Sequence, residues 1–326
     1  MMSIKIGLFG YGNIAKAVEK DINQYPDMEL VAVFTRREPS LIEKESAAPV
    51  FSQEKACSME GKIDVMLMCG SSVSDLPSQS PEMAGYFNIV DCFDTHAKIP
   101  GHFNKVNKAA LESGKTAIIS VGWDPGTFSL NRLLAQVILP RGKSYTFWGK
   151  GVSQGHSDAV RRVRGVKDAK QYTIPIDSAL EAVRNGENPD FTPRNMHLRE
   201  CFIVPEEGAD KNEIEKTVKN MPNYFKDYDT IVHFISREEF IKNHSTIPHG
   251  GFVLRSGTTG EGNKQIIECS LKLDSNPEFT ANVMLCYARA AFRLNKDGNI
   301  GCKTVFDIPP YLLFNGTQEE MRERLL

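Results

Sequence analysis

The chain has 326 residues, 41% of them apolar and 25% charged, which fits a globular protein of one large or two medium domains. A net charge of −2 gives it no general attraction to nucleic acid or to an anionic membrane. No apolar run reaches the roughly 18 residues of a membrane span, and the first residues do not have the layout of a signal peptide. Seven scattered cysteines without a CxxC pair predict free thiols in a reducing cytoplasm, and no pattern indicates a metal site.

Short apolar runs alternate with helical stretches along the first 122 residues. Strands are predicted at 4–10, 28–36, 62–70, 86–94 and 116–122, and helices at 13–26 and 102–115. Apolar strands separated by helices are typical of a parallel sheet that is covered on both faces. We therefore predict an α/β fold with an N-terminal, Rossmann-type, doubly wound parallel sheet.

The pattern changes after residue 123. Longer, less regular strands at 143–151, 198–206 and 230–238 indicate a second, α+β domain built on a mostly antiparallel sheet. Apolar residues at helical spacing predict a helix near the end of the chain, with Pro277 in its first turn and Gly298 at its end. We predict a dinucleotide-binding domain at 1–122, on which 277–326 packs back, and a second domain at 123–276.

A glycine-rich turn follows the first strand and opens the first helix. The pattern is Gly10-x-Gly12-x-x-Ala15. The first glycine permits the tight turn, the second lets the backbone approach a pyrophosphate, and the small third residue lets helix and strand pack closely. The helix N-terminus adds unpaired N–H donors and the positive end of its dipole. This context predicts a dinucleotide site.

Two arginines stand where such a fold often places one acid. An acid at the end of the second strand would bind the ribose 2′-hydroxyl of NAD and repel a 2′-phosphate. This chain has Thr35, Arg36 and Arg37 there, a hydroxyl and two guanidinium groups that suit a phosphate dianion. The residues favour NADP as the cofactor, and the alternative is a solvated basic turn.

Small and acidic residues follow the other predicted strands. Cys69, Gly70, Ser71 and Ser72 end one strand, Asp94 lies at the tip of the next, and Asp124 follows the third in a turn. Strand ends of a doubly wound sheet meet at one crevice. Two carboxylates beside a nicotinamide indicate a substrate that carries an amine. Each aspartate could instead be a turn or N-cap residue.

Seven segments of the chain carry a resemblance to a known family. They are "GYGN" near the start, "GWDPGTFSLNR" at 122–132, "TFWGKGVSQGHSDAVRR" at 146–162, "QYTIP" at 171–175, "IPHGG" at 247–251, "LKLDSNPEFTA" at 271–281 and "PPYLL" at 309–313. Through them the sequence resembles the meso-diaminopimelate D-dehydrogenase family over nearly its whole length. The segments at 122–132 and 146–162 are the most specific to the family.

The resemblance implies an activity. Members of the family are NADP-dependent bacterial enzymes of lysine biosynthesis. They oxidise the D-centre of meso-2,6-diaminopimelate reversibly to L-2-amino-6-oxopimelate and ammonia. The resemblance also implies a homodimer formed by the second domain, which would bind the substrate. Two other functions remain open: a different amine or imine oxidoreductase, such as a dihydrodipicolinate reductase-like enzyme, and a catalytically silent NADP(H) sensor.

The resemblance further implies the site residues. Together with Gly10, the expected cofactor contacts are Tyr11, Gly12, Asn13, Ile14, Thr35, Arg36, Arg37, Cys69, Gly70, Ser71, Ser72, Cys92, Phe93, Asp94, Val121, Gly122, Trp123, Asp124 and Pro125. The expected substrate contacts are Asp94, Asp124, Trp148, Gln154, Thr173, Arg199, His249 and Asn276, with Asp94 and Asp124 as the catalytic pair. Cys92 and Phe93 depart from the threonine and tyrosine of relatives, which removes a hydroxyl near the nicotinamide.

The second-domain residues have alternative explanations when they are taken without the family. Trp148 could belong to the core, and His249 could be bonded to backbone in a turn. Arg199 could pair with a surface acid such as Glu200, and Asn276 has the position of a helix N-cap. The basic run at 161–165 suits a solvated face.

Overall fold

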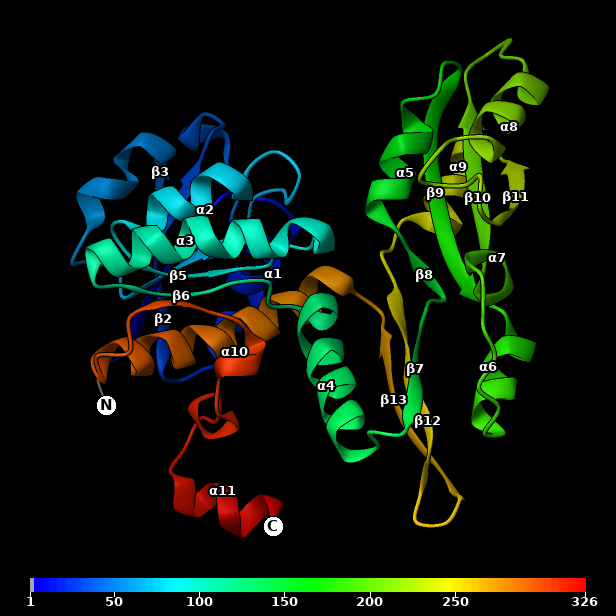
Figure 1. Ribbon diagram of the computed structural model, residues 1–326. Helices are drawn as coiled ribbons and strands as arrows, with labels where there is room; N and C mark the ends of the chain where they lie inside the picture. Colours follow the sequence, from blue (N-terminus) through cyan, green and yellow to red (C-terminus); the bar gives the residue numbers. More distant parts are fainter. Residues whose placement is uncertain (1–2) are drawn as a thin grey trace. The chain divides into compact units, whose positions relative to one another are not determined.

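A computed structural model describes residues 3–326, and contacts within the chain divide it into two compact units. The first unit runs up to Leu130 and adds Pro277–Leu326, while the second is the continuous stretch Asn131–Asn276. Figure 1 shows how the first unit is completed: the orange helix α10, late in the chain, lies beside the blue and cyan elements.

The first unit contains a parallel sheet. Within residues 3–326 it has seven strands in the order β14-β6-β5-β4-β1-β2-β3. They are β1 (Ile4–Phe9), β2 (Met28–Thr35), β3 (Val50–Ser52), β4 (Val65–Met68), β5 (Asn88–Asp91), β6 (Thr116–Ile118) and β14 (Gly301–Lys303). The predicted doubly wound sheet is confirmed. The two edge strands β3 and β14 were not predicted, because three residues are too short for a recognisable pattern.

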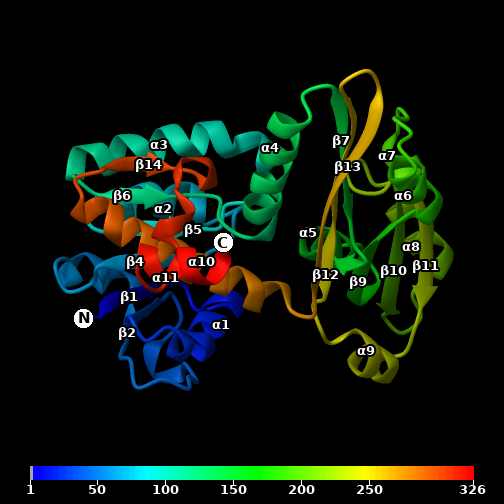
Figure 2. The same cartoon turned by 90° about the horizontal axis from the view of Figure 1, so that it is seen from below.

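Alternating side chains on each strand supply two cores, one on each face of this sheet. Leu8 and Leu67 contribute to one core, and their neighbours Phe9 and Met66 contribute to the other. Helices α1 (Asn13–Asp21) and α10 (Asn276–Lys296) cover the first face, and α2 (Leu76–Ala84) and α3 (Ile99–Ser113) cover the second. Figures 1 and 2 show α3 and α10 on opposite sides of the strands. Both faces are buried, which explains the near-continuous apolar runs of the strands.

Two smaller sheets make up the second unit. One has the order β13-β12-β7, with β7 (Gly142–Trp148), β12 (His249–Thr259) and β13 (Asn263–Leu273). The other has the order β11-β10-β9-β8, with β8 (Gly151–Val152), β9 (Val166–Pro175), β10 (His197–Pro205) and β11 (Asp229–Phe234). The predicted mostly antiparallel arrangement is confirmed, and the parallel pair β10–β11 is its exception. Strands β9, β12 and β13 were not predicted.

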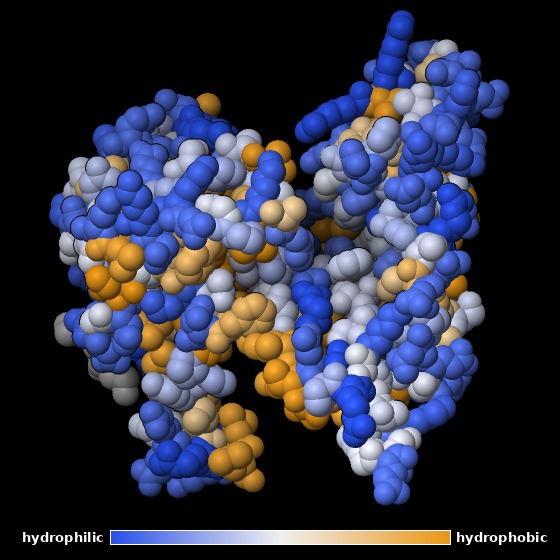
Figure 3. Space-filling model, in the orientation of Figure 1, coloured by the Kyte–Doolittle hydropathy of each residue, from blue (hydrophilic) through white to orange (hydrophobic). Residues whose placement is uncertain are grey.

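The remaining helices are α4 (Phe128–Ile138), α5 (Gln154–Arg161), α6 (Asp177–Arg184), α7 (Pro193–Met196), α8 (Lys211–Lys219), α9 (Arg237–His244) and α11 (Gln318–Leu325). Along α4, four apolar side chains are exposed: Leu133, Leu134, Val137 and Ile138. Figure 3 shows an orange area over this helix. In the described part of the chain, no helix is long and apolar enough to cross a membrane, and no cluster of three or more His, Cys, Asp or Glu side chains could hold a metal ion.

Candidate functional site

A tight turn joins β1 to α1 and leaves open space beside it. Gly10 has a φ of +97°, which favours glycine, and its N–H donates to the Phe34 carbonyl (2.8 Å). Gly12 has ordinary extended backbone, and apart from its two chain neighbours a Cβ there would meet no atom of the described residues within 4 Å. The protein itself therefore does not require glycine at position 12, whereas a pyrophosphate that approaches the backbone would. The residues of this turn fit a bound dinucleotide.

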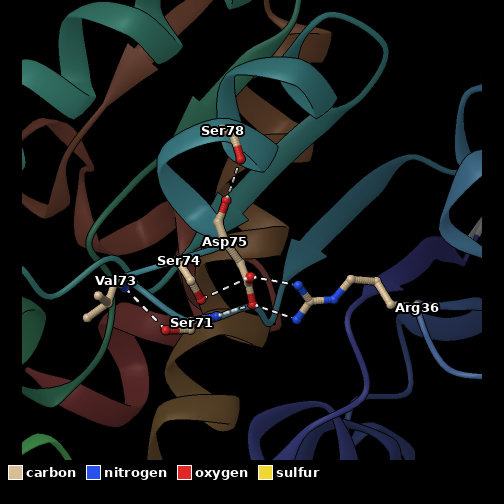
Figure 4. A network of polar contacts seen from close by, with 6 residues as sticks. All are labelled: Arg36, Ser71, Val73, Ser74, Asp75 and Ser78. Atoms are coloured by element: carbon tan, nitrogen blue, oxygen red, sulfur yellow. Dashed lines mark hydrogen bonds and ion pairs between the residues drawn. The ribbon is translucent and has the colours of Figure 1, made fainter.

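The arginine pair after β2 is held by protein groups. Thr35 is buried, and its hydroxyl accepts a hydrogen bond from the Arg37 backbone N–H (3.1 Å). The Arg37 guanidinium donates to the Tyr11 carbonyl (2.6 Å). Arg36 forms a two-pronged ion pair with Asp75 (3.0 and 3.1 Å), which Figure 4 shows. Both guanidinium groups thus have fixed partners, unlike those of a solvated basic turn.

The loop after β4 connects the neighbouring strand ends. A Cβ on Gly70 would lie 2.7 Å from the Cβ of Asp75, so only glycine fits there. The Ser72 hydroxyl accepts a hydrogen bond from the Asp94 backbone N–H (3.1 Å). Burial raises the pKa of the Cys69 thiol to about 12, so this cysteine is not a nucleophile at neutral pH. The loop supplies polar groups and close backbone approach rather than chemistry of its own.

A buried acid fixes the ends of β5 and β6. The Asp91 carboxylate accepts hydrogen bonds from the backbone N–H groups of Phe93 (3.1 Å) and Ser120 (2.9 Å). Its second oxygen lies 2.7 Å from Nε2 of His102, whose ring stacks on Phe93 at a centroid distance of 4.2 Å. The Asp91 carbonyl accepts from Val121 N–H (3.0 Å). These contacts hold the two loops that carry the predicted catalytic acids.

Asp94 and Asp124 lie in the loops after two adjacent strands. Strand β5 pairs directly with β6, and Asp94 follows β5 while Asp124 follows β6. Asp94 is exposed and Asp124 is partly exposed. The Asp124 loop is closed by a hydrogen bond from Thr127 N–H to the Gly122 carbonyl (3.0 Å) and contains Gly126 at a φ of +131°. Two carboxylates at neighbouring strand ends can orient a cationic amine.

Some predicted cofactor residues direct their side chains into the core. Tyr11, Phe93, Val121 and Trp123 are all buried. The Tyr11 hydroxyl donates to Glu19, and burial together with this acid raises the pKa of the phenol. Because these side chains are occupied inside the protein, a cofactor would meet these positions through their backbone atoms.

In the second unit, Arg199 is a buried cation. It is 7% exposed, and its guanidinium donates to the hydroxyl of Thr173, its direct partner in the β9–β10 ladder. The guanidinium carbon lies 4.0 Å from the centre of the Tyr228 ring. No carboxylate in residues 3–326 forms an ion pair with Arg199, and its buried Nε has no hydrogen-bond partner there. Glu200 pairs instead with His233, so the explanation of Arg199 by a surface ion pair is wrong.

Two histidines near this cation are held neutral. Burial and the charge of Arg199 lower the pKa of His197 to about 4, and the same causes lower the pKa of His156 to about 4. His197 accepts a hydrogen bond from Trp148 N–H (2.9 Å) and stacks on the indole at a centroid distance of 5.5 Å. Trp148 is 39% exposed, so it does not belong to the core. A buried cation among neutral groups favours an anionic ligand.

Two of the other predicted substrate residues start elements of the second unit, and the third starts α10. Gln154 opens α5, and His249 opens β12, where Nδ1 accepts from Gly250 N–H (2.8 Å). Gly151, the β8 partner of Thr173, is packed so closely that a Cβ would lie 2.6 Å from the His249 ring. Strand register also pairs Gly251 with Trp148. The strands thus gather Trp148, Thr173, Arg199 and His249 at one junction of the second unit. Asn276 opens α10, and its N–H bonds the Ile247 carbonyl (3.1 Å).

The sequence reasoning missed three polar residues that organise the strand ends: Asp75, Asp91 and His102. Asp75 precedes Leu-Pro at a helix start, which is an N-cap signal that could have drawn attention to it. Asp91 is the one acid within the mostly apolar stretch 87–93, and an acid in such a place must have partners if it is buried. His102 has no signal in the sequence, because its partner is defined only by the fold.

Comparisons with known proteins place this geometry in context. Residues 122–275 match the family model of the diaminopimelic acid dehydrogenase C-terminal domain. The chain is 62% identical to the meso-diaminopimelate D-dehydrogenase of Acetivibrio thermocellus, across 99% of this chain and 98% of that protein.

Two solved structures are similar over the full length. One is a variant of the Clostridium tetani E88 meso-diaminopimelate dehydrogenase with DAP, 50% identical, with a TM-score of 0.95, covering 99% of this chain and 100% of the other. That variant carries Q154L, T173I, R199M, P248S, H249N and N276S, and this chain has the unsubstituted residue type at each of these numbers. The other is an engineered D-amino acid dehydrogenase bound to NADP+, 39% identical, with a TM-score of 0.88 and complete coverage of both chains.

Proposed function

The chain belongs to the meso-diaminopimelate D-dehydrogenase family, and from this premise we propose that it oxidises the D-centre of meso-2,6-diaminopimelate with NADP. The products are L-2-amino-6-oxopimelate and ammonia, and the reaction is reversible and serves lysine biosynthesis. The observation that carries the proposal is 62% identity along 99% of the chain. The buried cation Arg199, without a protein carboxylate, supports an acidic substrate.

The reaction balances as a two-electron oxidation followed by hydrolysis. NADP, when bound, accepts a hydride from the D-carbon. The carbon–nitrogen bond of the substrate becomes an imine, and water then adds to the carbon and releases ammonia. Residues of the first unit that fit this cofactor are the turn at Gly10 and Gly12 and the anchored arginines after β2. Their task is to bind and orient, since the cofactor supplies the difficult chemistry.

We assign Asp94 and Asp124 to the reacting amine. Both are carboxylates at adjacent strand ends of the sheet that carries the phosphate turn, where a nicotinamide is expected. Their charges favour an ammonium substrate and orient its nitrogen. Hydride loss requires a neutral amine, so a proton must leave first. Its acceptor is Asp124, a water that Asp124 holds, or bulk solvent.

We assign Arg199 to the carboxylate of the non-reacting, L-configured end. A planar guanidinium binds a carboxylate through two parallel hydrogen bonds, and burial strengthens the charge interaction. The other residues that we assign to this end are Thr173, His249, Asn276, Gln154 and Trp148. Strand register supports the placing of Thr173 and Trp148 beside Arg199. A substrate with two similar stereocentres is then discriminated by which end these residues accept.

We also infer that the protein is a cytoplasmic homodimer. All seven cysteines are free, which suits a reducing compartment. The exposed apolar residues of α4 belong to the second unit and suit an interface between copies of the chain. Cell fractionation and sedimentation velocity check the two statements, and a purified chain that sediments as a monomer refutes the second.

The decisive experiment is NADP reduction followed at 340 nm with purified protein. We expect activity with meso-diaminopimelate and none with the LL isomer, because only a D-centre would present its hydrogen to the nicotinamide. The DD isomer is a control, because it has a D-centre that could react but lacks an L-configured distal end. Its rate therefore tests whether that end is required. Comparable rates with the meso and LL isomers refute the assignment. Binding of NADP without turnover of any isomer supports the silent sensor instead.

A further inference from the structure

Asp75 lies in the loop after β4, and its side chain does not make the hydrogen bond that is expected at its position. It occupies the N-cap position of α2, yet its carboxylate makes no capping hydrogen bond to that helix. An N-cap aspartate normally stabilises its helix by accepting from the N–H groups of the first turn. Here the carboxylate bonds to other groups, and these groups lie where the proposed cofactor residues are.

Four contacts hold the Asp75 carboxylate. One oxygen accepts from Ser71 N–H (3.0 Å) and from Nη2 of Arg36 (3.1 Å). The other accepts from the Ser74 hydroxyl (3.1 Å) and from Nη1 of Arg36 (3.0 Å). Figure 4 shows the guanidinium meeting the carboxylate end-on with both terminal nitrogens. The carboxylate is thereby fixed to the loop after β4, while the arginine follows β2.

The two partners differ in burial. The side chain of Asp75 is 9% exposed, whereas that of Arg36 is 66% exposed. The carboxylate is therefore the fixed member of the pair, and it orders a long side chain that would otherwise sample many rotamers. Burial alone would raise the pKa of Asp75, but the bonds from Ser71, Ser74 and Arg36 outweigh it and lower this pKa below its ordinary value. The Asp75 carboxylate therefore stays charged at neutral pH.

End-on pairing leaves part of the guanidinium available. Arg36 has five N–H donors in a planar fork, and the carboxylate uses one on each terminal nitrogen. Within residues 3–326 its Nε–H has no bonding partner. The Nε edge of the fork can therefore still bind an anion with two parallel hydrogen bonds.

We propose that Asp75 is a positioning residue for cofactor selection, which holds Arg36 end-on so that its Nε edge serves the 2′-phosphate of NADP. Asp75 acts through Arg36 and does not touch the phosphate. The inference rests on the proposed use of NADP. It extends the selectivity determinant from the arginines after β2 to an acid in the loop after β4.

The sign of the effect separates positioning from simple charge. A carboxylate near a phosphate repels it, so by charge alone Asp75→Asn should tighten NADP binding. Positioning predicts weaker NADP binding. In the wild-type protein the pair with Asp75 already orders the Arg36 side chain, whereas in Asp75→Asn the binding of NADP must supply this ordering free energy. Loss of this ordering corresponds to a roughly three- to tenfold weaker affinity.

The test is calorimetric titration of the cofactor-free protein with NADP, NAD and 2′,5′-ADP. For Asp75→Asn we expect the Kd of NADP and of 2′,5′-ADP to rise roughly three- to tenfold, with that of NAD unchanged. Glu38→Gln is the matched control: it removes an exposed acid two residues after Arg36 that forms no ion pair within the described chain, and NADP binding should not weaken. In the Arg36→Ala background, Asp75→Asn should add no further loss.

Several outcomes overturn the proposal. The first is that Asp75→Asn binds NADP as tightly as the wild type or more tightly. The second is that Asp75→Asn weakens the binding of NADP and of NAD equally. The third is that Asp75→Asn weakens NADP binding in the Arg36→Ala background as much as it does in the wild type. If Asp75→Asn does not fold, Arg36→Lys tests the pair through the other partner. A lysine ammonium keeps the charge, but it cannot form the two parallel hydrogen bonds to the Asp75 carboxylate. Wild-type affinity of Arg36→Lys for 2′,5′-ADP refutes the proposal. If the wild-type protein binds neither NADP nor 2′,5′-ADP, the assignment of NADP as the cofactor is itself refuted.

Discussion

At the scale of single residues, the most informative feature is the burial of Arg199 without a counter-ion. A buried charge usually has an ion-pair partner, because desolvation costs several kcal/mol. Arg199 contacts only the Thr173 hydroxyl and the Tyr228 ring, and neither is a carboxylate. Burial accordingly lowers its pKa from the ordinary value, although a guanidinium remains protonated. The buried charge of Arg199 is therefore unfavourable in the protein alone, and an anionic ligand would reduce this cost.

Arg199→Met should therefore weaken substrate binding without lowering the stability of the protein. We expect the KM for meso-diaminopimelate to rise about ten- to a hundredfold, since a charged hydrogen-bond pair to a carboxylate is lost. NADP affinity should be unchanged, and Tm should be equal or higher, because no protein ion pair is broken. Steady-state kinetics and thermal unfolding measure both.

The matched control for this substitution is Arg237→Met. Arg237 is half-exposed and pairs with Asp168, so it belongs to the same unit but to its surface. Its replacement should leave the KM for the substrate unchanged. If Arg199→Met behaves like this control, Arg199 has no role in substrate binding and the second-unit assignment fails.

At the scale of elements, one ion pair ties the late helix α10 to the start of the sheet. Arg289 on α10 is 1% exposed and donates to Asp27, just before β2, at 2.6 and 2.8 Å. It also donates to the Leu313 carbonyl (2.7 Å). Burial would raise the pKa of Asp27, but the bonds and charge of Arg289 outweigh it and lower this pKa. The lowered pKa connects the stability of this contact to pH.

Asp27→Asn should reduce the free energy of unfolding by about 3 kcal/mol at neutral pH, because a buried guanidinium loses its charged partner. A carboxyl whose folded pKa is depressed contributes stability above its unfolded pKa of about 3.9 and loses it as the pH falls through the folded value. The gap between wild type and Asp27→Asn should thus be constant from about pH 8 to 5 and narrow below about pH 4. Urea unfolding across this range measures it.

An exposed pair joins the same helix to α1 and provides the comparison. Lys20 and Glu278 are 61% and 47% exposed, so Glu278→Gln should cost less than about 1 kcal/mol. A loss for Asp27→Asn as small as this, or a gap that persists unchanged to about pH 3, would contradict the account of the buried pair.

At the scale of the whole molecule, the two units differ in chain continuity. The second unit is one stretch, Asn131–Asn276, with its own clusters of buried residues. The first unit is discontinuous, and α10 supplies much of the core on one face of its sheet. The residues that α10 buries there are Ala281, Met284, Leu285, Tyr287, Ala288, Ala290, Ala291 and Leu294.

We predict that the fragment 131–276 folds alone, whereas 1–130 requires 277–326. The reason is that 1–130 without α10 would expose one apolar face of a parallel sheet, which occurs almost only with both faces covered. Circular dichroism and urea unfolding of the separate fragments check this. A cooperative transition for 1–130 alone, or none for 131–276, would show that the units are not independent folding domains.

The first-unit part of the candidate site could be predicted from the sequence because its signals are local, and its role in binding remains a prediction. The glycine turn, the arginines after β2 and the acids at strand ends are each read within a few residues of a predicted strand. The substrate residues were different: Trp148, Arg199 and His249 were selected by family resemblance, and their alternative explanations were plausible. The structure removes the core explanation for Trp148 and the surface explanation for Arg199. It leaves their roles in binding as predictions.

The sequence by itself determined the parallel sheet, the glycine turn after its first strand, the preference for NADP and the family, because periodicity and short motifs reside in neighbouring residues. Only the tertiary structure decided the partners. Arg36 and Asp75 are 39 positions apart, Arg199 and Thr173 are 26 apart, and Arg289 and Asp27 are 262 apart. Each pair meets because strand order, register or a returning helix brings distant segments together. No local pattern encodes such a pairing, since its energy depends on burial that exists only once the chain has folded.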